Sequence, residues 1–436
     1  MNLTDKPFLT GSRSNSSWLV GLLFLFGNTL FGYAMTAQAE QTAIVGATVH
    51  TVTQAEPVVN ATILIEDGVI TALGKDVSVP LGYAVVEAAG KQVTPGIIES
   101  YSQLGLEEVG AIRSSVDSRL ESVSVGAAFD VQYGVNPGST LLAVNLMEGV
   151  THAVTAPQVG PSLFAGQGAV IDLSKGKVIL PRAAVFASAS ARASILVGGS
   201  RAEVIGYLRQ VMTDLASFNP RRYEPAEGQL PKRDMIALKT MQRTGQPLVV
   251  EVHRANEIRE LVKLAQAFDL NLVLRGAAEA WQVADLLAAN SIPVIVDVLG
   301  NIPDDFDQLG ARMDNAAMLT AAGVQVLFTV NDSHRARQLR QYAGNAVAEG
   351  MAPHAALAAM TANVARAFGL PEKVGTVQVG APANLVVWNG DPLELSTWPE
   401  HVFVDGVSVS LESRQTRLFK RYVDLEAGKA SGFSYQ

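Results

Sequence analysis

The sequence of 436 residues contains no cysteine and only six histidines. The absence of cysteine excludes disulfide bonds, zinc sites built from thiolates and cysteine nucleophiles. Histidine and carboxylate side chains therefore remain as the ligands that the chain can offer to a transition metal. The histidines are His50, His152, His253, His334, His354 and His401.

The chain is also poor in charge, and it has no run of basic residues. Charged residues make up 17% of the sequence and the formal net charge is −8, which argues against broad electrostatic binding to nucleic acid. Hydrophobic residues make up 48%, which argues against intrinsic disorder and a coiled coil. The length suits two or three domains, or one large α/β barrel with an additional domain.

The longest apolar run, residues 17–35, follows a polar segment with two basic residues. Ala37 and Ala39 then match the small-residue pattern of a signal-peptidase site. We therefore interpret residues 1–39 as a secretory signal peptide, which predicts a periplasmic location in a Gram-negative host. The alternative is an uncleaved leader that anchors the chain, because the run approaches the roughly 20 residues that span a bilayer. The sequence predicts no other membrane contact.

Both ends of the mature chain are rich in β-branched residues and carry hairpin signals. An Asp-Gly pair at residues 67–68 separates two apolar runs, and another at residues 405–406 does the same near the carboxyl end. An Asp-Gly pair in this position is typical of a tight β-hairpin turn. We expect residues 40–93 and 380–436 to form one small β-sandwich domain from both chain ends.

Between these ends, apolar strand patterns alternate with helical patterns. The strand patterns cover residues 96–104, 150–157, 168–173, 247–253, 270–276, 292–300 and 324–332, and the helical patterns cover residues 255–269, 277–290, 313–323 and 353–370. Several of the strand patterns are almost continuously apolar, as in parallel strands buried on both faces. The alternation predicts an α/β fold in which residues 94–379 form a (β/α)8 barrel. It does not locate the fourth barrel strand.

Three segments carry motifs of a known family. Residues 90–105 are GKQVTPGIIESYSQLG, residues 148–173 contain GVTHAVTAP and GQGAVIDL, and residues 360–393 contain TANVARAFGL and GAPANLVVWNGD. These motifs resemble the amidohydrolase superfamily, and its imidazolonepropionase-like branch in particular. The resemblance extends over nearly all of the mature chain. It implies a TIM-like barrel with a composite β-sandwich, and metal-assisted hydrolysis of carbon–nitrogen bonds in non-peptide or cyclic amides.

The chain departs from this family at the positions that would bind the metals. The family's first barrel strand normally ends in H-x-H, where this chain has Tyr101, Ser102 and Gln103. At the sixth strand, Arg275 and Gly276 stand where the resemblance implies a metal-binding histidine. A guanidinium is always charged and would repel a metal cation. We therefore expect the metal centre to be degenerate and expect no metal cofactor.

The fifth and last strands retain some candidate ligands. Glu251, His253 and Asp332 are the residual candidates for a single divalent metal such as zinc, which is the alternative to a metal-free site. Asp332 matches the family's terminal aspartate and is the candidate general base; alternatively, it is a carboxylate paired with a neighbour such as Arg275. The residues that we expect to bind substrate are Tyr101, Gln103, Glu251, His253, Arg275 and His334.

Two functions of different classes remain open. The first is an exported hydrolase of carbon–nitrogen bonds with weak or no activity. The second is a non-catalytic homologue that binds a small molecule in the barrel mouth, or that forms a complex with an active paralogue or a second copy of itself. Residues 106–137 are long for a connection between strand and helix, and we expect them to cover the barrel mouth or to pair subunits.

Overall fold

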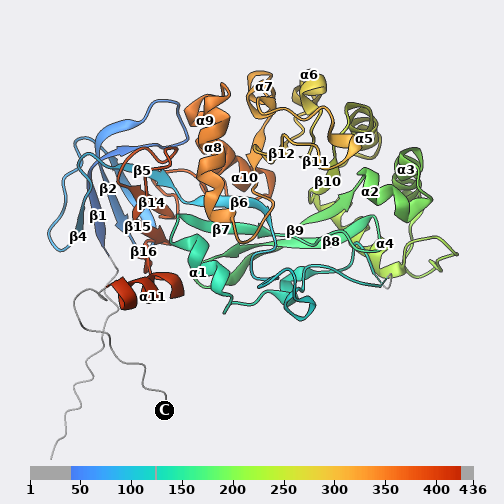
Figure 1. The fold of residues 1–436 in the computed structure, drawn as a ribbon, viewed down its shortest axis with the longest axis horizontal. Helices are drawn as coiled ribbons and strands as arrows, with labels where there is room; N and C mark the ends of the chain where they lie inside the picture. The colour runs from blue at the N-terminus through green and yellow to red at the C-terminus, as the bar shows by residue number, and fades with distance from the viewer. Residues whose placement is uncertain (1–40, 123–124, 424–436) are drawn as a thin grey trace, which may run out of the picture. The chain divides into compact units, whose positions relative to one another are not determined.

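The structure is a computed structural model, and it describes residues 41–122 and 125–423. The predicted signal peptide lies outside these residues. The described chain forms two sheets of eight strands each, with helices packed around the second sheet (Figure 1). None of the described helices is both long enough and apolar enough to cross a membrane.

The first sheet joins the two ends of the described chain. Its strands follow the order β16-β15-β14-β5-β1-β2-β3, and β4 pairs with β1. Strand β5 pairs antiparallel with β14, so the two ends share one sheet, as the sequence predicts. The strands are β1 Thr42–Val49, β2 Val58–Glu66, β3 Val69–Gly74, β4 Ala84–Glu87, β5 Gln92–Pro95, β14 Leu385–Trp388, β15 Pro399–Val404 and β16 Val407–Ser408.

Both predicted hairpin turns form, and they contact each other. Asp67 and Gly68 link β2 to β3 with φ of 50° and 80°, and Asp405 and Gly406 link β15 to β16 with φ of 49° and 76°. Positive φ at both central residues gives a turn whose twist matches that of the flanking strands. A Cβ atom on Gly68 would lie 2.6 Å from the carbonyl oxygen of Asp405. The contact between the turns therefore requires glycine at position 68.

The second sheet is the barrel, with its strands in the order β13-β12-β11-β10-β9-β8-β7-β6. Two side chains link its first and last strands: the Ser100 hydroxyl donates to the Phe328 carbonyl at 2.6 Å, and the Thr329 hydroxyl donates to the Tyr101 carbonyl at 2.8 Å. The predicted TIM-like barrel is confirmed. Its strands are β6 Ile97–Ser102, β7 Val150–Thr155, β8 Phe164–Asp172, β9 Lys177–Ser188, β10 Leu248–Val252, β11 Leu272–Gly276, β12 Val294–Val296 and β13 Val326–Phe328.

The barrel departs from the expected all-parallel pattern at β8. This strand pairs antiparallel with both β7 and β9, so the interpretation of residues 168–173 as a parallel strand is wrong. The physical reason is the length of its connections. Residues 156–163 and 173–176 link it to its neighbours, and a parallel crossover needs a dozen or more residues.

The fourth barrel strand, which the sequence pattern does not locate, is β9. Pro181 interrupts its apolar run, and proline inside a run argues against a strand. The structure resolves this conflict with a bulge: Val170 faces Leu180 and Gly168 faces Ala184, so three residues of β9, 181–183, stand opposite the single residue Ala169 of β8. Arg182 within the bulge has φ of 51°.

The helices, except the carboxyl-terminal one, pack around the barrel. Helix α5 buries Ile258, Leu261, Val262 and Ala265, the i, i+3, i+4, i+7 pattern of a helix with one apolar face. The helices are α1 Thr140–Leu146, α2 Ala191–Ser194, α3 Arg201–Ser217, α4 Lys232–Thr244, α5 Ala255–Phe268, α6 Ala284–Ala289, α7 Asn315–Ala321, α8 Leu339–Ala348, α9 Pro353–Ala359, α10 Ala362–Ala367 and α11 Arg414–Tyr422.

Two helices are shorter than the sequence predicts. The pattern at residues 353–370 forms α9 and α10, because the carbonyl of Met360 between them accepts a hydrogen bond from the Ile98 amide of β6 at 2.9 Å. The pattern at residues 277–290 begins with the 3-10 helix η4, Ala280–Val283, and continues as α6. Its first residue, Ala277, has φ of 44°, which a helix cannot include.

Candidate functional site

Side chains from the carboxyl ends of several barrel strands meet around a cavity of about 450 Å³. The carboxyl ends of barrel strands are where enzymes of this fold place their active sites. The cavity is lined mainly by hydroxyl, amide and charged groups, which suits a small polar ligand. Its lining residues are Tyr101, Gln103, Gln158, Val159, Gly160, Ser188, Ser190, Arg192, Ala193, Leu196, Glu251, Arg275 and Asn331.

The Arg275 guanidinium stands at the centre of this site. Its Nη2 lies 2.9 Å from Glu251 Oε1, and its Nη1 donates to Asn331 Oδ1 at 3.2 Å. Its Cζ also lies 4.1 Å from the centroid of the Tyr101 ring, in cation–π geometry. Burial opposes the charge, but Glu251 and Tyr101 outweigh burial and raise the pKa of Arg275. The site therefore contains a permanent cation held by three side chains.

Glu251 is the counter-charge of Arg275. Its Oε2 accepts a hydrogen bond from the Ser188 hydroxyl at 3.0 Å. Burial disfavours the carboxylate, but Arg275, His253 and the Ser188 hydroxyl outweigh burial and lower the pKa of Glu251 below its ordinary value. At neutral pH the pair is thus a carboxylate and a guanidinium. Such a carboxylate is a weak base.

A second, smaller cavity of about 120 Å³ shares Glu251, Arg275 and Asn331 with the first and adds His253 and Asp297. Burial lowers the pKa of His253 and raises the pKa of Asp297 to about 6. The imidazole of His253 is therefore neutral at pH 7.

The His253 ring packs closely on β11. A Cβ atom on Gly276, which has φ of +83°, would lie 2.6 Å from His253 Cε1. Among the described residues, the buried Nδ1 of His253 has no hydrogen-bond partner. Glycine after Arg275 thus makes room for the imidazole beside the guanidinium.

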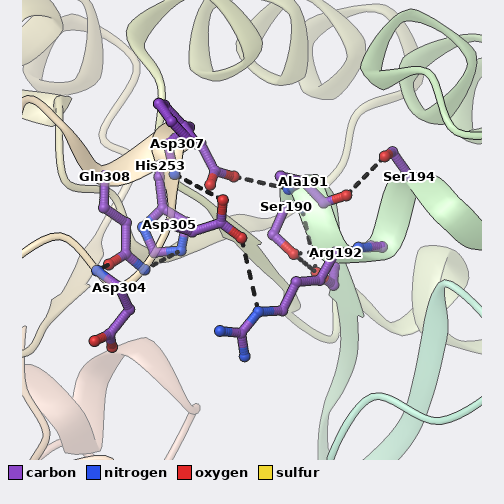
Figure 2. A network of polar contacts seen from close by, with 12 residues as sticks. Ser190, Ala191, Arg192, Ser194, His253, Asp304, Asp305, Asp307 and Gln308 are labelled. Atoms are coloured by element: carbon purple, nitrogen blue, oxygen red, sulfur yellow. Dashed lines mark hydrogen bonds and ion pairs between the residues drawn. The ribbon is translucent and has the colours of Figure 1, made fainter.

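Residues 304–308, in the loop after β12, lie beside His253 and the segment that follows β9 (Figure 2). Gln308 Nε2 lies 3.4 Å from His253 Nε2. Asp307 Oδ2 accepts a hydrogen bond from the Ala191 amide at 2.7 Å, and Arg192 Nε lies 3.7 Å from Asp305 Oδ2. The loop is therefore tied to the segment that follows β9.

Asp332 and His334 do not join the other candidate residues. Asp332 Oδ1 accepts hydrogen bonds from the amides of His334 at 2.8 Å and Arg335 at 3.2 Å, and Arg335 Nε lies 3.0 Å from its Oδ2. Burial opposes ionisation, but these bonds outweigh it and lower the pKa of Asp332. Asp332 therefore pairs with Arg335 rather than with Arg275. His334 is exposed, and neither residue lines the two cavities.

Three residues in or near the site are not among those that the sequence predicts. Asn331, next to Asp332, has φ of 55° and faces Arg275. Ser188 was missed because β9 was missed. Glu99 on β6 is fully buried, and its carboxyl accepts from the amides of Tyr101 at 3.2 Å and Val330 at 3.4 Å. Burial raises the pKa of Glu99 to about 8. A glutamate within the apolar run GIIES was the available signal.

Two further predictions concern Gln103 and the long segment 106–137. Gln103 follows β6 and is buried. Its backbone N–H donates a hydrogen bond to the Ser333 hydroxyl at 2.9 Å. The long segment 106–137 does not cover the 450 Å³ cavity with any of its described residues. Instead, the amides of Gly126 and Ala128 each donate to the buried Asp234 of α4 at 2.8 Å.

The donor set at the barrel mouth does not fit a divalent metal. In residues 41–122 and 125–423, no group of three or more histidine, aspartate and glutamate side chains is arranged to hold a metal ion. Tyr101 and Gln103 offer no imidazole, and the guanidinium of Arg275 takes up the charge of Glu251. A metal cation beside Glu251 would face this guanidinium directly, and the two cations would repel each other.

A family model, a curated protein and solved structures all relate this chain to amidohydrolases. Residues 237–409 match the model of the amidohydrolase family. The chain is 22% identical over 392 residues to the amidohydrolase tasK of Hapsidospora irregularis. This match covers 79% of the chain and 39% of that longer protein, so the chain spans about two fifths of its curated relative.

Solved structures show the same fold. The crystal structure of an amidohydrolase from Thermotoga maritima MSB8 is 24% identical, with a TM-score of 0.75 over 85% of this chain and 99% of that one. Molinate hydrolase is 18% identical with a TM-score of 0.53, over 86% of this chain and 95% of its own. Together with the barrel and the second sheet described above, these matches support membership of the amidohydrolase superfamily.

Proposed function

We propose that this protein is an exported, non-catalytic member of the superfamily that binds a small polar molecule at the barrel mouth. An arginine–glutamate pair takes the place of the metal centre. The observation that carries the proposal is the position of Arg275, which contacts Glu251, Asn331 and the Tyr101 ring at once. A guanidinium supplies positive charge, but it is not a Lewis acid and cannot activate a bound water as a metal does.

The protonation states at the site also favour binding over hydrolysis. A general base works best when its pKa is close to the working pH, and Arg275 holds the pKa of Glu251 below its ordinary value. Asp332, the carboxylate that the family resemblance implies as the base, is engaged by Arg335 outside both cavities. The larger cavity therefore offers hydrogen-bonding groups and charge, and Glu251, its one carboxylate, is a weak base.

The lining charges favour a ligand that carries a carboxylate. Arg192 and Arg275 contribute two positive charges to the larger cavity, and Glu251 contributes one negative charge. Since Glu251 is already paired with Arg275, the cation available to a ligand carboxylate is Arg192 on the rim, which is 79% exposed and has only a long contact of 3.7 Å to Asp305. The amide and hydroxyl groups of the lining suit the amide portion of an N-acyl amino acid or a cyclic amide, which is the class we propose.

The test combines metal analysis with ligand binding on the purified protein. After dialysis, elemental analysis should find zinc, iron and manganese well below one equivalent. Thermal-shift and calorimetric titrations should detect N-acyl amino acids in preference to the matched N-alkyl amides that lack the carboxylate. Hydrolysis of these compounds, followed with and without added zinc, should stay at the level of the Glu251→Gln variant.

Two variants separate site effects from general effects of charge removal. Arg192→Met, which removes the cation on the rim of the cavity, should strongly weaken binding of the carboxylate ligand. Arg335→Met, which removes an arginine paired with Asp332 outside the cavities, should leave binding unchanged. Stoichiometric bound metal, or metal-dependent turnover that is lost in Glu251→Gln, would overturn the proposal in favour of a hydrolase.

A second candidate function is a complex with an active paralogue. In the loop after β12, the side chains of Ile302, Phe306 and Leu309 are 77%, 81% and 64% exposed. Exposed apolar clusters of this kind often mark protein interfaces. Co-expression with an intact H-x-H homologue, followed by size-exclusion chromatography, tests this candidate. Loss of co-elution in Phe306→Ser, with ligand binding retained, would support the complex; separate elution of the two wild-type proteins would reject it.

A further inference from the structure

The carboxyl-terminal helix α11, Arg414–Tyr422, lies apart from the helices around the barrel (Figure 1). Its start is fixed by a capping box: the Thr416 amide donates to the Ser413 hydroxyl at 3.2 Å, and the Ser413 amide donates to the Thr416 hydroxyl at 2.8 Å. In the part of the chain that the structure describes, no residue of α11 is buried. Local capping, rather than packing on the domain, therefore supports this helix.

The helix separates its residues into an apolar and a basic face. At 3.6 residues per turn, its apolar side chains fall on one side and its cations fall on the opposite side. The apolar residues, extended by one position beyond the helix, are Leu418, Phe419, Tyr422 and Val423, with exposed fractions of 40%, 69%, 40% and 56%. The basic residues are Arg414, Arg417, Lys420 and Arg421.

The charge of α11 is opposite to that of the chain as a whole. The formal net charge of the protein is −8, whereas this helix carries four cations and no acidic residue. Glu412, just before the helix, pairs with Lys420, which leaves the three arginines of the basic face. Two aromatic side chains and clustered cations on one short helix are the composition of helices that lie in the surface of an anionic membrane.

We propose that α11 docks the protein on the surface of a bilayer that contains anionic phospholipid. The apolar face inserts at the boundary between headgroups and acyl chains, and the basic face contacts the phosphates. The helix lies in the plane of the surface, since nine residues rise only about 14 Å and cannot span a bilayer. This contact is independent of the leader and of the barrel-mouth ligand.

The experiment measures co-sedimentation of the full chain with vesicles. Vesicles of phosphatidylcholine mixed with phosphatidylglycerol should bind the protein, vesicles of phosphatidylcholine alone should bind it much less, and added salt should weaken binding. Each cation near an anionic surface strengthens partitioning roughly fivefold. Arg417→Gln together with Arg421→Gln should therefore lower the partition coefficient by about 20- to 30-fold.

A variant of the apolar face and two matched controls complete the test. Phe419→Ser with Tyr422→Ser should lower partitioning at least tenfold. Arg221→Gln with Arg222→Gln removes two exposed cations from a distant loop, and Leu395→Ser removes an apolar side chain that is 73% exposed; both should bind as the parent does.

All variants carry the same predicted leader, so differences in vesicle binding among them come from the substitutions. Vesicle binding that survives unchanged in both helix variants would overturn the proposal, since it would come from another part of the chain. Equal binding to neutral and anionic vesicles would overturn it as well. Thermal melts of each variant should match the parent because α11 does not pack on the domain, and this establishes that a loss of binding is not a loss of fold.

Discussion

Replacing Arg275 with methionine tests the electrostatic design of the barrel mouth. The change keeps much of the side-chain volume and removes the cation that neutralises Glu251. At the 2.9 Å between Nη2 and Oε1, two unit charges attract by about 6 kcal/mol at an effective dielectric constant of 20. The Glu251 side chain is 23% exposed, so water screens part of the carboxylate charge that has lost its partner in the variant. We expect the free energy of unfolding at pH 7 to fall by about 2–4 kcal/mol.

The loss should depend on pH in a defined direction. In the parent protein the pKa of Glu251 is lowered, so the ion pair stabilises the fold above the ordinary carboxylate pKa and this contribution disappears as the pH falls through the folded-state pKa. In the variant, Arg275 no longer opposes the effect of burial on Glu251, so the pKa of this carboxyl rises and it can take up a proton at higher pH than in the parent. The difference between the two proteins should thus be largest at pH 7 and should shrink toward pH 4.

Urea unfolding at both pH values measures this difference, and a double variant provides the control. Glu251→Gln combined with Arg275→Met removes both charges and should recover most of the stability lost in the single variant. Arg335→Met breaks a pair whose arginine side chain is 58% exposed and should cost under about 1 kcal/mol. An Arg275→Met loss no larger than that of Arg335→Met, or additive effects in the double variant, would refute the reasoning.

Three further outcomes follow from the site. Burial raises the pKa of Glu99 to about 8, so the folded state keeps a proton that the unfolded state releases, and stability falls as the pH rises from about 5 to 8; Glu99→Gln should flatten this slope in thermal melts. Gly276→Ala forces a Cβ to within 2.6 Å of the His253 ring and should cost over 2 kcal/mol in urea unfolding, whereas Gly323→Ala, with φ of +86° and open space, should cost about 1 kcal/mol. Asp332→Asn should leave the calorimetric affinity for the carboxylate ligand within twofold of the parent, since Asp332 lines neither cavity.

The parts of the fold that the sequence predicts well are those with a local cause. Asp-Gly pairs specify the two hairpin turns because few other residues accept the backbone angles that these turns need. The apolar spacing of residues 255–269 similarly specifies α5, which ends one residue earlier at Phe268. By contrast, the direction of β8 depends on the lengths of its two connections. The pattern of apolar residues within the strand contains no information about these lengths. Pro181 concealed β9 because a bulge, a property of the strand pair, accommodates it.

The site shows the same division between local and long-range information. The resemblance brought Tyr101, Glu251 and Arg275 to one end of the barrel, and the structure places them in contact. It did not predict that Asn331, rather than its neighbour Asp332, faces the guanidinium. That choice depends on the left-handed backbone angle at Asn331 and on the competing partner Arg335, neither of which a strand motif contains.

If Arg275 occupies the electrostatic role of a metal, adding imidazoles at the positions that the family resemblance implies should not be enough to give metal binding. Tyr101→His with Gln103→His recreates the H-x-H pair but leaves a guanidinium whose Cζ lies 4.1 Å from the centre of the ring at position 101. At that distance each unit of charge on an incoming cation is repelled by about 4 kcal/mol at an effective dielectric constant of 20, which corresponds to roughly a thousandfold in affinity.

Adding Arg275→Gly to this pair of histidines should therefore raise the affinity for zinc by at least that factor, as measured by titration against a competing chelator. Arg335→Gly in the same background is the matched control and should leave the affinity unchanged. Tight zinc binding by the two-histidine variant with Arg275 intact would contradict the argument, because the guanidinium would then not exclude a metal from the site.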